Sequence, residues 1–218
     1  GGVYPGAVSL SVAVPDIGVT RSVLFHLPQS YQPQQAWPVV LVLHGAAGSA
    51  AAAPLAADQV RSLWAALAEQ EGFIVIAPVA SGSSGGWVPS SDQPLLACAL
   101  AEAGRRYNVD LDRRYLWGFS AGAHFGHAVA LGNSARFAAY AVKAGALGAS
   151  SCGPDMSGYP CSIVLPRLPR RIPVGLRIGT SDPLIAQASH DAQRFQSAGW
   201  LAGADLEYAE INGGHTLD

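Results

Sequence analysis

The chain has 218 residues, of which 50% are hydrophobic and 13% are charged, and its formal net charge is −2. This length and composition fit one globular α/β domain with a substantial core and exclude a disordered chain. The near-neutral charge provides no broad basic field, so we expect no nucleic acid partner. No apolar run is long and unbroken enough to span a bilayer, so no membrane span is expected.

Short apolar runs alternate along the chain with alanine-rich segments of helical character. In the first half we predict an antiparallel hairpin of strands, then a strand, a helix, a strand and a helix, at residues 7–14, 21–28, 38–43, 55–70, 72–80 and 93–107. In the second half we predict strands at 113–119, 137–145, 172–180 and 205–211 and helices at 121–132 and 186–199. This alternation predicts a single domain, residues 1–218, with a mostly parallel doubly wound sheet.

Polar residues follow four of the predicted parallel strands at the point where each strand ends. In chain order they are His44, Ser120, Asp182 and His215. Ligands of doubly wound sheets bind beyond the carboxyl ends of the strands, where these residues would meet. A serine, a histidine and an acid in one place are the components of nucleophilic catalysis by an activated hydroxyl.

The segment Gly118-Phe119-Ser120-Ala121-Gly122 has the pattern of a nucleophile elbow. In such an elbow, a strained strand-to-helix turn lifts the serine hydroxyl off the sheet, and small neighbours leave room for it. We therefore predict Ser120 as the nucleophile. The N–H of Ala121, at the start of the following helix, is expected to face the developing oxyanion. A packing serine between two glycines is the alternative interpretation.

Three histidines compete for the role of general base. His124 and His127 lie one to two turns into the helix that follows Ser120, so their side chains cannot easily reach back to the hydroxyl. His215 follows the last predicted strand, in the glycine-rich loop "NGGHT". We predict His215 as the base and a structural or surface role for the other two.

The acid that orients the base is predicted to be Asp182, which directly follows a strand in "GTSDP". Its carboxylate would hold the histidine tautomer and stabilise the imidazolium. Asp155, between two cysteines, and Asp191, inside a predicted helix, are the rival acids. Neither follows a strand directly.

Two loops near the other strand ends are candidates for binding. The loop "HGAAG" after residue 43 is predicted to supply a second oxyanion donor, the Ala46 N–H, with the Ala47 N–H as the alternative. His44 is expected to organise this loop and to lie at the substrate site. In the glycine-rich loop 80–92, Trp87 either lines the substrate pocket or only anchors the loop.

The three cysteines are too few for a disulfide scaffold. Cys152 and Cys161 bracket a short Pro/Gly-rich loop and are plausible disulfide partners, which would indicate secretion or periplasmic export. A cytoplasmic location is the alternative. Cys98 lies in a helical run and is expected to be a buried thiol. No Cys or His pair has the spacing of metal ligands, so no metal and no cofactor are expected.

The segments "VLVLHGAAG", "GFIVIAP", "RYNVDLDRRYLWGFSAGA", "IGTSDPLI" and "NGGHT" follow one another in the order seen in α/β-hydrolase esterases. The chain resembles most the polyhydroxybutyrate depolymerase and feruloyl esterase branch, over residues 7 to 216. This resemblance implies the α/β-hydrolase fold and the same nucleophile, acid and base as above. No insertion is long enough for a lipase-type lid, and no helical pattern follows His215 to anchor its loop.

The sequence therefore predicts a serine carboxylic-ester hydrolase for short-acyl or aryl esters, carried on a small molecule or a polymer. A polyhydroxyalkanoate depolymerase is the alternative within this class. A nucleotide-binding domain is disfavoured, because neither G-x-G-x-x-G nor a P-loop pattern follows the first parallel strand. A hydrolase-fold module that only binds is the remaining alternative, although all three catalytic positions are filled.

Overall fold

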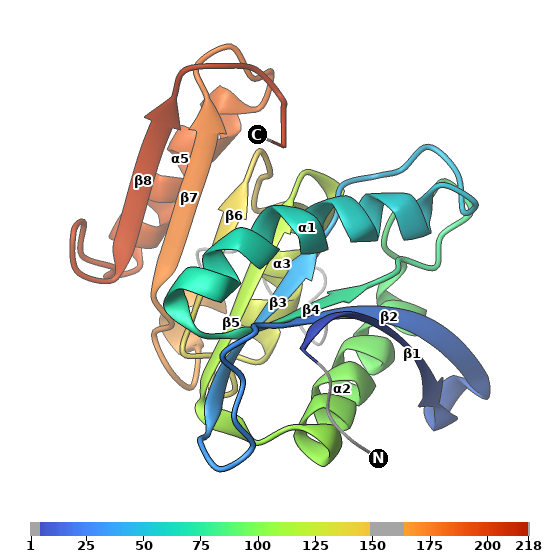
Figure 1. The fold of residues 1–218 in the computed structure, drawn as a ribbon. Helices are drawn as coiled ribbons and strands as arrows, with labels where there is room; N and C mark the ends of the chain where they lie inside the picture. Colours follow the sequence, from blue (N-terminus) through green and yellow to red (C-terminus); the bar gives the residue numbers. More distant parts are fainter. Residues whose placement is uncertain (1–4, 149–163, 218) are drawn as a thin grey trace. The chain divides into compact units, whose positions relative to one another are not determined.

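The computed structural model describes residues 5–148 and 164–217 (Figure 1). The chain divides into two compact units. The first unit comprises Gly1–Tyr115 and the second Leu116–Asp218. The single domain over residues 1–218 stays a prediction. Cys152, Cys161 and the rival acid Asp155 lie outside the described residues.

The first unit contains a sheet in which four strands lie in the order β1-β2-β4-β3. Their bounds are β1 Gly6–Val14, β2 Val19–Leu27, β3 Trp37–Leu43 and β4 Ile74–Pro78. Strand β1 pairs antiparallel with β2 over its whole length, which confirms the predicted hairpin. Strand β2 is antiparallel to β4, whereas β3 and β4 are parallel.

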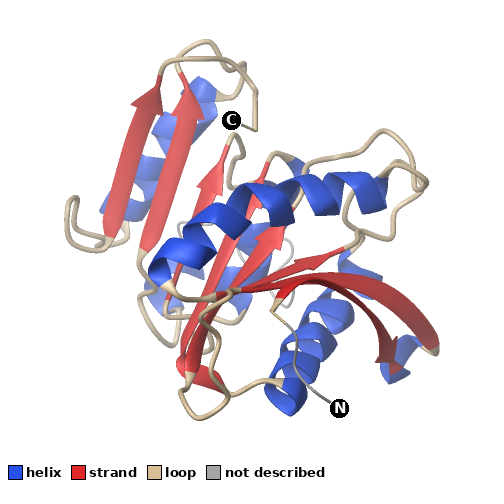
Figure 2. Ribbon diagram, viewed as in Figure 1, coloured by secondary structure: helices blue, strands red, loops and turns tan. Residues whose placement is uncertain are grey.

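Two helices pack on these strands, α1 at Ala53–Glu71 and α2 at Pro89–Arg106. Helix α1 packs on β2, β3 and β4, and α2 packs on β1 and β4 (Figure 2). Strands β3 and β4 are buried along nearly their whole length, as their continuous apolar sequences predict. Helix α1 ends at Gly72, whose φ of 74° gives the left-handed cap that glycine adopts without strain.

The second unit contains three parallel strands in the order β6-β7-β8, next to the end of β5. The strands are β5 Val109–Phe119, which spans the boundary between the units, β6 Ala139–Lys143, β7 Val174–Gly179 and β8 Leu206–Ile211. Helix α3, Ala121–Gly132, packs on β6, and α5, Ile185–Ser197, packs on β7 and β8. Helix α3 is almost entirely buried, because most of its own residues are small or apolar, on every face of the helix.

Every predicted strand and helix is present, and most ends differ from the prediction by one or two residues. The largest differences are at β5, which begins at Val109 and not at residue 113, and at α2, which begins at Pro89 and not at residue 93. Proline is tolerated in the first turn of a helix, where its missing N–H costs nothing. The predicted 80–92 loop is therefore shorter than expected and ends at Val88. No connection within residues 5–148 and 164–217 contains an inserted lid domain.

Cys98 corrects one expectation. It lies in α2, as predicted, but it is half-buried and not fully buried, and it is a free thiol. Burial still raises the pKa of this thiol above its ordinary value, and the nearby Asp16 adds to the rise. The helix turns this position partly towards solvent, which its apolar neighbours in the sequence did not indicate.

Candidate active site

Ser120 lies at a strained turn between β5 and α3. Its φ of 52° and ψ of −117° are unusual for a residue with a side chain, and such backbone strain costs about 1–3 kcal/mol. Gly118 makes the turn sterically feasible, because a Cβ there would lie 2.3 Å from the carbonyl oxygen of Gly122. The Ser120 N–H donates to the Lys143 carbonyl at 3.0 Å. The predicted elbow geometry is therefore present at this residue.

The structure brings Ser120, Asp182 and His215 together within the second unit. The Ser120 Oγ lies 2.8 Å from His215 Nε2. On the other side of the same ring, Nδ1 lies 2.8 Å from Asp182 Oδ2. Both distances are those of hydrogen bonds, although the three residues lie far apart in the sequence.

Asp182 determines which nitrogen of His215 carries the proton. The aspartate is only 2% exposed, and its other oxygen accepts the Leu184 N–H at 2.8 Å. An ionised carboxylate can only accept, so His215 Nδ1 must donate to it. In the neutral ring, Nε2 is then an acceptor and receives the Ser120 O–H. This arrangement can withdraw the hydroxyl proton.

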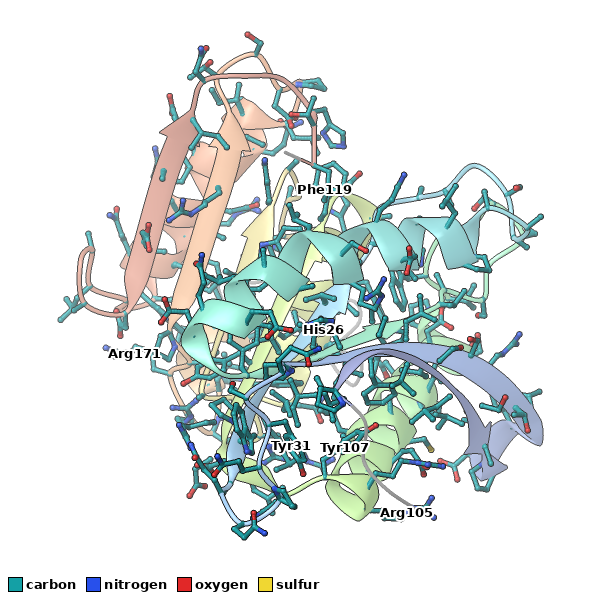
Figure 3. All side chains as sticks on the ribbon, viewed as in Figure 1. His26, Tyr31, Arg105, Tyr107, Phe119 and Arg171 are labelled. Atoms are coloured by element: carbon teal, nitrogen blue, oxygen red, sulfur yellow. The ribbon has the colours of Figure 1, made fainter. Side chains whose placement is uncertain are left out.

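The ring of His215 is also held from the side. Phe119, which is labelled in Figure 3, lies at the carboxyl end of β5. Its ring centroid is 5.5 Å from that of His215. Phe119 itself packs on a small core formed by Ala144, Ile178 and Ala188. The residue before the nucleophile thus links the histidine to the core of its unit.

The loops that carry Asp182 and His215 are joined by their backbones. The Thr180 N–H donates to Ile211 and the Ser181 N–H donates to Gly213, both at 2.8 Å. At Gly179, a Cβ would lie 2.4 Å from the carbonyl oxygen of Gly214, so only glycine permits this approach. The sequence left open how the histidine loop is held, and these contacts supply part of the answer.

Ala121 is the first residue of α3, so its N–H belongs to the helical N-terminal groups that have no acceptor within the helix. In the first unit, the two candidates of the "HGAAG" loop differ. The Ala47 N–H donates to the Gly85 carbonyl at 3.2 Å, whereas Ala46 is exposed and no such bond engages its N–H among the described residues. This difference favours Ala46 over Ala47 as a free donor.

His44 lies in the first unit, where the residue is 1% exposed. The Ala80 N–H donates to Nε2 at 3.1 Å, so the proton is on Nδ1, which donates to the Gly45 carbonyl at 2.6 Å. Burial lowers the pKa of His44 below its ordinary value, which keeps the ring neutral. Contact with a substrate would require this ring to be uncovered, so the geometry favours the loop-organising role.

Trp87 is half-buried and held against the same loop. Its indole N–H donates to the His44 carbonyl at 2.8 Å, and the two ring centroids are 5.0 Å apart. The anchoring interpretation of Trp87 therefore has a direct structural basis. Its contact with a substrate stays a prediction.

Asp92 was missed by the sequence analysis. Its side chain is completely buried in the first turn of α2, and Oδ2 accepts the N–H groups of Val88 at 2.7 Å and Ser81 at 3.3 Å. It thus holds both ends of the loop that contains Trp87. An aspartate three residues after a proline that starts a helix was the available signal.

The other histidines and the rival acid have separate partners. His127 is buried and its Nδ1 lies 3.0 Å from the Tyr140 hydroxyl; burial, aided by His124, lowers its pKa to about 3. His124 Nδ1 lies 2.7 Å from the Ala146 carbonyl oxygen. Asp191 accepts the Leu147 N–H at 2.7 Å, and burial raises its pKa. The contacts of these residues are those of structural groups.

The described residues contain neither a membrane-spanning helix nor a cluster of metal ligands. Within residues 5–148 and 164–217, no helix has both the length and the apolar character needed to cross a membrane. In the same residues, no group of three or more His, Cys, Asp or Glu side chains is arranged to hold a metal ion.

No protein-family model matches the chain, and no curated protein matches it at a significant level. Solved structures do match. A ferulic acid esterase superposes with a TM-score of 0.75 at 16% identity, covering 96% of this chain and 91% of that chain. S-formylglutathione hydrolase from Staphylococcus aureus gives 0.70 at 15% identity, covering 99% and 93%.

A peptidase is also among the similar structures. Porphyromonas gingivalis dipeptidyl peptidase 4 superposes with a TM-score of 0.66 at 15% identity, covering 98% of this chain and 33% of that chain. At these identities the likeness concerns the fold and not the reaction. The strand order, the elbow and these neighbours together show that the chain has the α/β-hydrolase fold.

Proposed function

We propose that the protein is a serine carboxylic-ester hydrolase, with Ser120 as nucleophile, His215 as general base and Asp182 as the orienting acid. One observation carries the proposal: His215 is hydrogen-bonded at 2.8 Å to Ser120 on one side and at 2.8 Å to Asp182 on the other. The strained backbone at Ser120 adds support, because strain of this kind clusters at functional sites.

The reaction has two halves. In the first, Ser120 Oγ attacks the ester carbonyl while His215 Nε2 takes the hydroxyl proton, and a tetrahedral oxyanion forms. The Ala121 N–H stabilises this oxyanion. The Ala46 N–H stays the second donor predicted from the sequence. His215 then gives the proton to the leaving alkoxide, and an acyl-enzyme remains on Ser120.

In the second half, water replaces the alcohol. His215 accepts a proton from the water, whose oxygen attacks the acyl carbonyl, and the collapse of the second tetrahedral intermediate releases the carboxylic acid. The proton on His215 returns to Ser120 Oγ. Asp182 stays ionised throughout and stabilises the imidazolium that forms twice. No metal or cofactor takes part in this scheme.

Short-acyl and aryl esters, such as hydroxycinnamoyl esters, are the proposed substrates. The absence of an inserted lid in the described residues supports soluble esters over long-chain lipids. The ferulic acid esterase among the similar structures supports an aryl acyl group. A polyhydroxyalkanoate depolymerase is the second candidate and rests on the motif resemblance alone. A panel of p-nitrophenyl esters from acetate to palmitate, beside methyl ferulate and a polyhydroxybutyrate film, separates these substrates.

Fluorophosphonate labelling tests the reaction class. An activated serine forms a covalent adduct with this probe, so intact and peptide mass spectrometry should locate one adduct on Ser120. The Ser120→Ala variant should fold and remain unlabelled. A module that only binds, or a nucleotide-binding domain, predicts no adduct on the wild-type protein.

We also propose that the protein is exported, to the periplasm or outside the cell. The proposal rests on the pair Cys152 and Cys161, because disulfides persist in oxidising compartments. Intact mass before and after reduction should differ by about two mass units if these residues are bridged. Three alkylatable thiols in the native protein would remove the basis for export.

A further inference from the structure

Lys143 is the only lysine of the chain, and it ends strand β6 within the second unit. Its side chain is largely buried, with the residue 8% exposed. The Nζ group donates to the carbonyl oxygen of Leu217 at 3.2 Å. The backbone carbonyl of the same residue accepts the Ser120 N–H at 3.0 Å. One residue is therefore bonded to the nucleophile turn and to the segment that follows His215.

Among the described residues, two backbone hydrogen bonds hold the segment next to His215. Before it, Gly213 accepts the Ser181 N–H, and within it the Thr216 N–H donates to Gly214 at 3.0 Å. Both bonds lie on the amino-terminal side of Leu217, and the second is internal to the loop. The Lys143 bond reaches the carboxyl-terminal side, two residues beyond His215. It is also charge-assisted, and such bonds are stronger than those between neutral groups.

Burial makes an accidental contact of this ammonium unfavourable. Removing a charged group from water is costly unless oxygen acceptors replace the water. An apolar residue would fill the end of β6 at no such cost, as Val142 does at the preceding position, where it is 2% exposed. The bond to the Leu217 carbonyl oxygen is therefore the best explanation for a lysine at this buried position.

We propose that Lys143 is a positioning residue for ester hydrolysis: its ammonium holds the segment after His215 in register with the strand that supports Ser120. The inference rests on the proposed function, whose site it extends. Lys143 touches neither the substrate nor the reacting atoms. It acts by keeping His215 Nε2 at hydrogen-bond distance from Ser120 Oγ, a distance to which proton transfer is sensitive.

The test compares Lys143→Met with Arg177→Met. Arg177 pairs with Lys143 in the register of β6 and β7, and its side chain forms an exposed ion pair with Glu207. Both variants remove one positive charge, but only the first removes a bond to the histidine segment. With p-nitrophenyl butyrate, Lys143→Met should lower kcat about 10- to 100-fold with KM within about twofold, because small misplacements of catalytic groups have effects of this size. Arg177→Met should stay within about twofold of wild type.

Lys143→Arg provides the rescue. A guanidinium keeps the charge and can donate to a carbonyl, although its planar shape fits a site made for a compact ammonium less well. It should restore part of the lost kcat. Lys143→Gln, whose side chain is one bond shorter, should behave as Lys143→Met does, and it replaces that variant if the methionine prevents folding.

A second measurement does not depend on turnover. The proton between His215 Nδ1 and Asp182 should give a downfield resonance in the proton NMR spectrum of the wild type and of Arg177→Met. In Lys143→Met, this resonance should broaden or disappear while the melting temperature stays near that of the control. Unchanged kcat with an unchanged resonance would overturn the proposal, as would a loss of activity that only follows a loss of folded protein.

The two proposals fail in different ways. If the wild-type protein hydrolyses no ester and takes no fluorophosphonate, the proposed function is wrong. The NMR comparison then still decides whether Lys143 orders His215. If the wild type is active and Lys143→Met matches Arg177→Met in both measurements, only the role of Lys143 is wrong.

Discussion

His215 and His44 both follow a strand in a glycine-containing loop, yet their surroundings differ completely. The side chain of His215 is 34% exposed, and its two nitrogens bond to side chains, Ser120 and Asp182. His44 is 1% exposed, and its two nitrogens bond to backbone groups of Ala80 and Gly45. The first ring can exchange a proton with a reactant, whereas the second is engaged in holding its own loop.

This comparison teaches that a histidine at a strand end is identified by its partners and not by its position. A catalytic base needs an acceptor nitrogen that faces the proton it removes, and a group that fixes its tautomer. His215 meets both conditions. His44 meets only the second, because its acceptor nitrogen is already engaged by a backbone N–H.

The largest expected effect concerns His215 and its partner Ser120. His215→Ala should lower kcat/KM by about 10⁴–10⁶-fold, as Ser120→Ala should, because members of a triad act as a unit. The melting temperature should change little, since the ring is partly exposed. Ester hydrolysis and thermal unfolding measured on the same preparation check this. Retention of a tenth of the activity by either variant would remove that residue from the mechanism.

The next largest effect is expected from a substitution in the turn that presents Ser120 to His215. In Gly118→Ala, the new Cβ would meet the Gly122 carbonyl oxygen at 2.3 Å, so the elbow must shift. We expect a loss of about 3 kcal/mol in the free energy of unfolding, with lower activity per folded molecule. Gly104→Ala is the control, because nothing lies within 4 Å of its added Cβ. This exposed helical site should gain about 0.5–1 kcal/mol in urea unfolding.

His44→Leu should affect mainly the stability of the protein, whereas His215→Ala should affect mainly its activity. The buried Ala80 N–H and the Gly45 carbonyl lose their partner, and each such loss costs about 1–3 kcal/mol. We therefore expect a clear drop in the free energy of unfolding, accompanied by a fall of about tenfold in kcat as the loop loosens. His190→Gln, at an exposed position on α5, should change neither. A His44→Leu protein of wild-type stability would contradict the structural role.

The smallest expected effect is on the pH dependence of stability, which should differ between a variant of the buried His127 and a variant of an exposed histidine. The pKa of His127 is about 3 in the folded protein, from burial first and His124 second, against 6.5 as the ordinary value. Above pH 6.5 the ring is neutral in both states, so its contribution to stability is complete. As the pH falls from 6.5 towards 3, only the unfolded chain binds the proton, and stability is lost by about 1.4 kcal/mol per pH unit.

Urea unfolding at pH 7 and pH 5 measures this loss. Between these values the wild type should lose about 2 kcal/mol more than His127→Gln, which keeps a polar group for Tyr140 but cannot titrate. His190→Gln should follow the wild type. Equal acid sensitivity in all three proteins would show that His127 does not remain neutral in the fold.

The order of strands and helices and the three residues of the proposed triad could be predicted from the sequence alone. Strand and helix periods differ, so the alternation is visible without coordinates. The carboxyl ends of parallel strands meet at one edge, so Ser120, Asp182 and His215 could be expected together once each was seen to follow a strand. Gly118 and Gly179 belong to the sequence motifs around Ser120 and Asp182. The structure adds the backbone atoms that a side chain at either position would strike.

Only the tertiary structure decided which backbone and buried groups are engaged. The Gly85 carbonyl takes the Ala47 N–H, the buried Asp92 holds the loop of Trp87, and Lys143 reaches Leu217. In two of these three contacts the partners lie far apart in the chain, and each contact has at least one partner in a loop, whose conformation follows no period that a sequence displays. Hydrogen bonds of this kind depend on where one loop places its carbonyl oxygens against another, and that placement exists only after the strands have assembled.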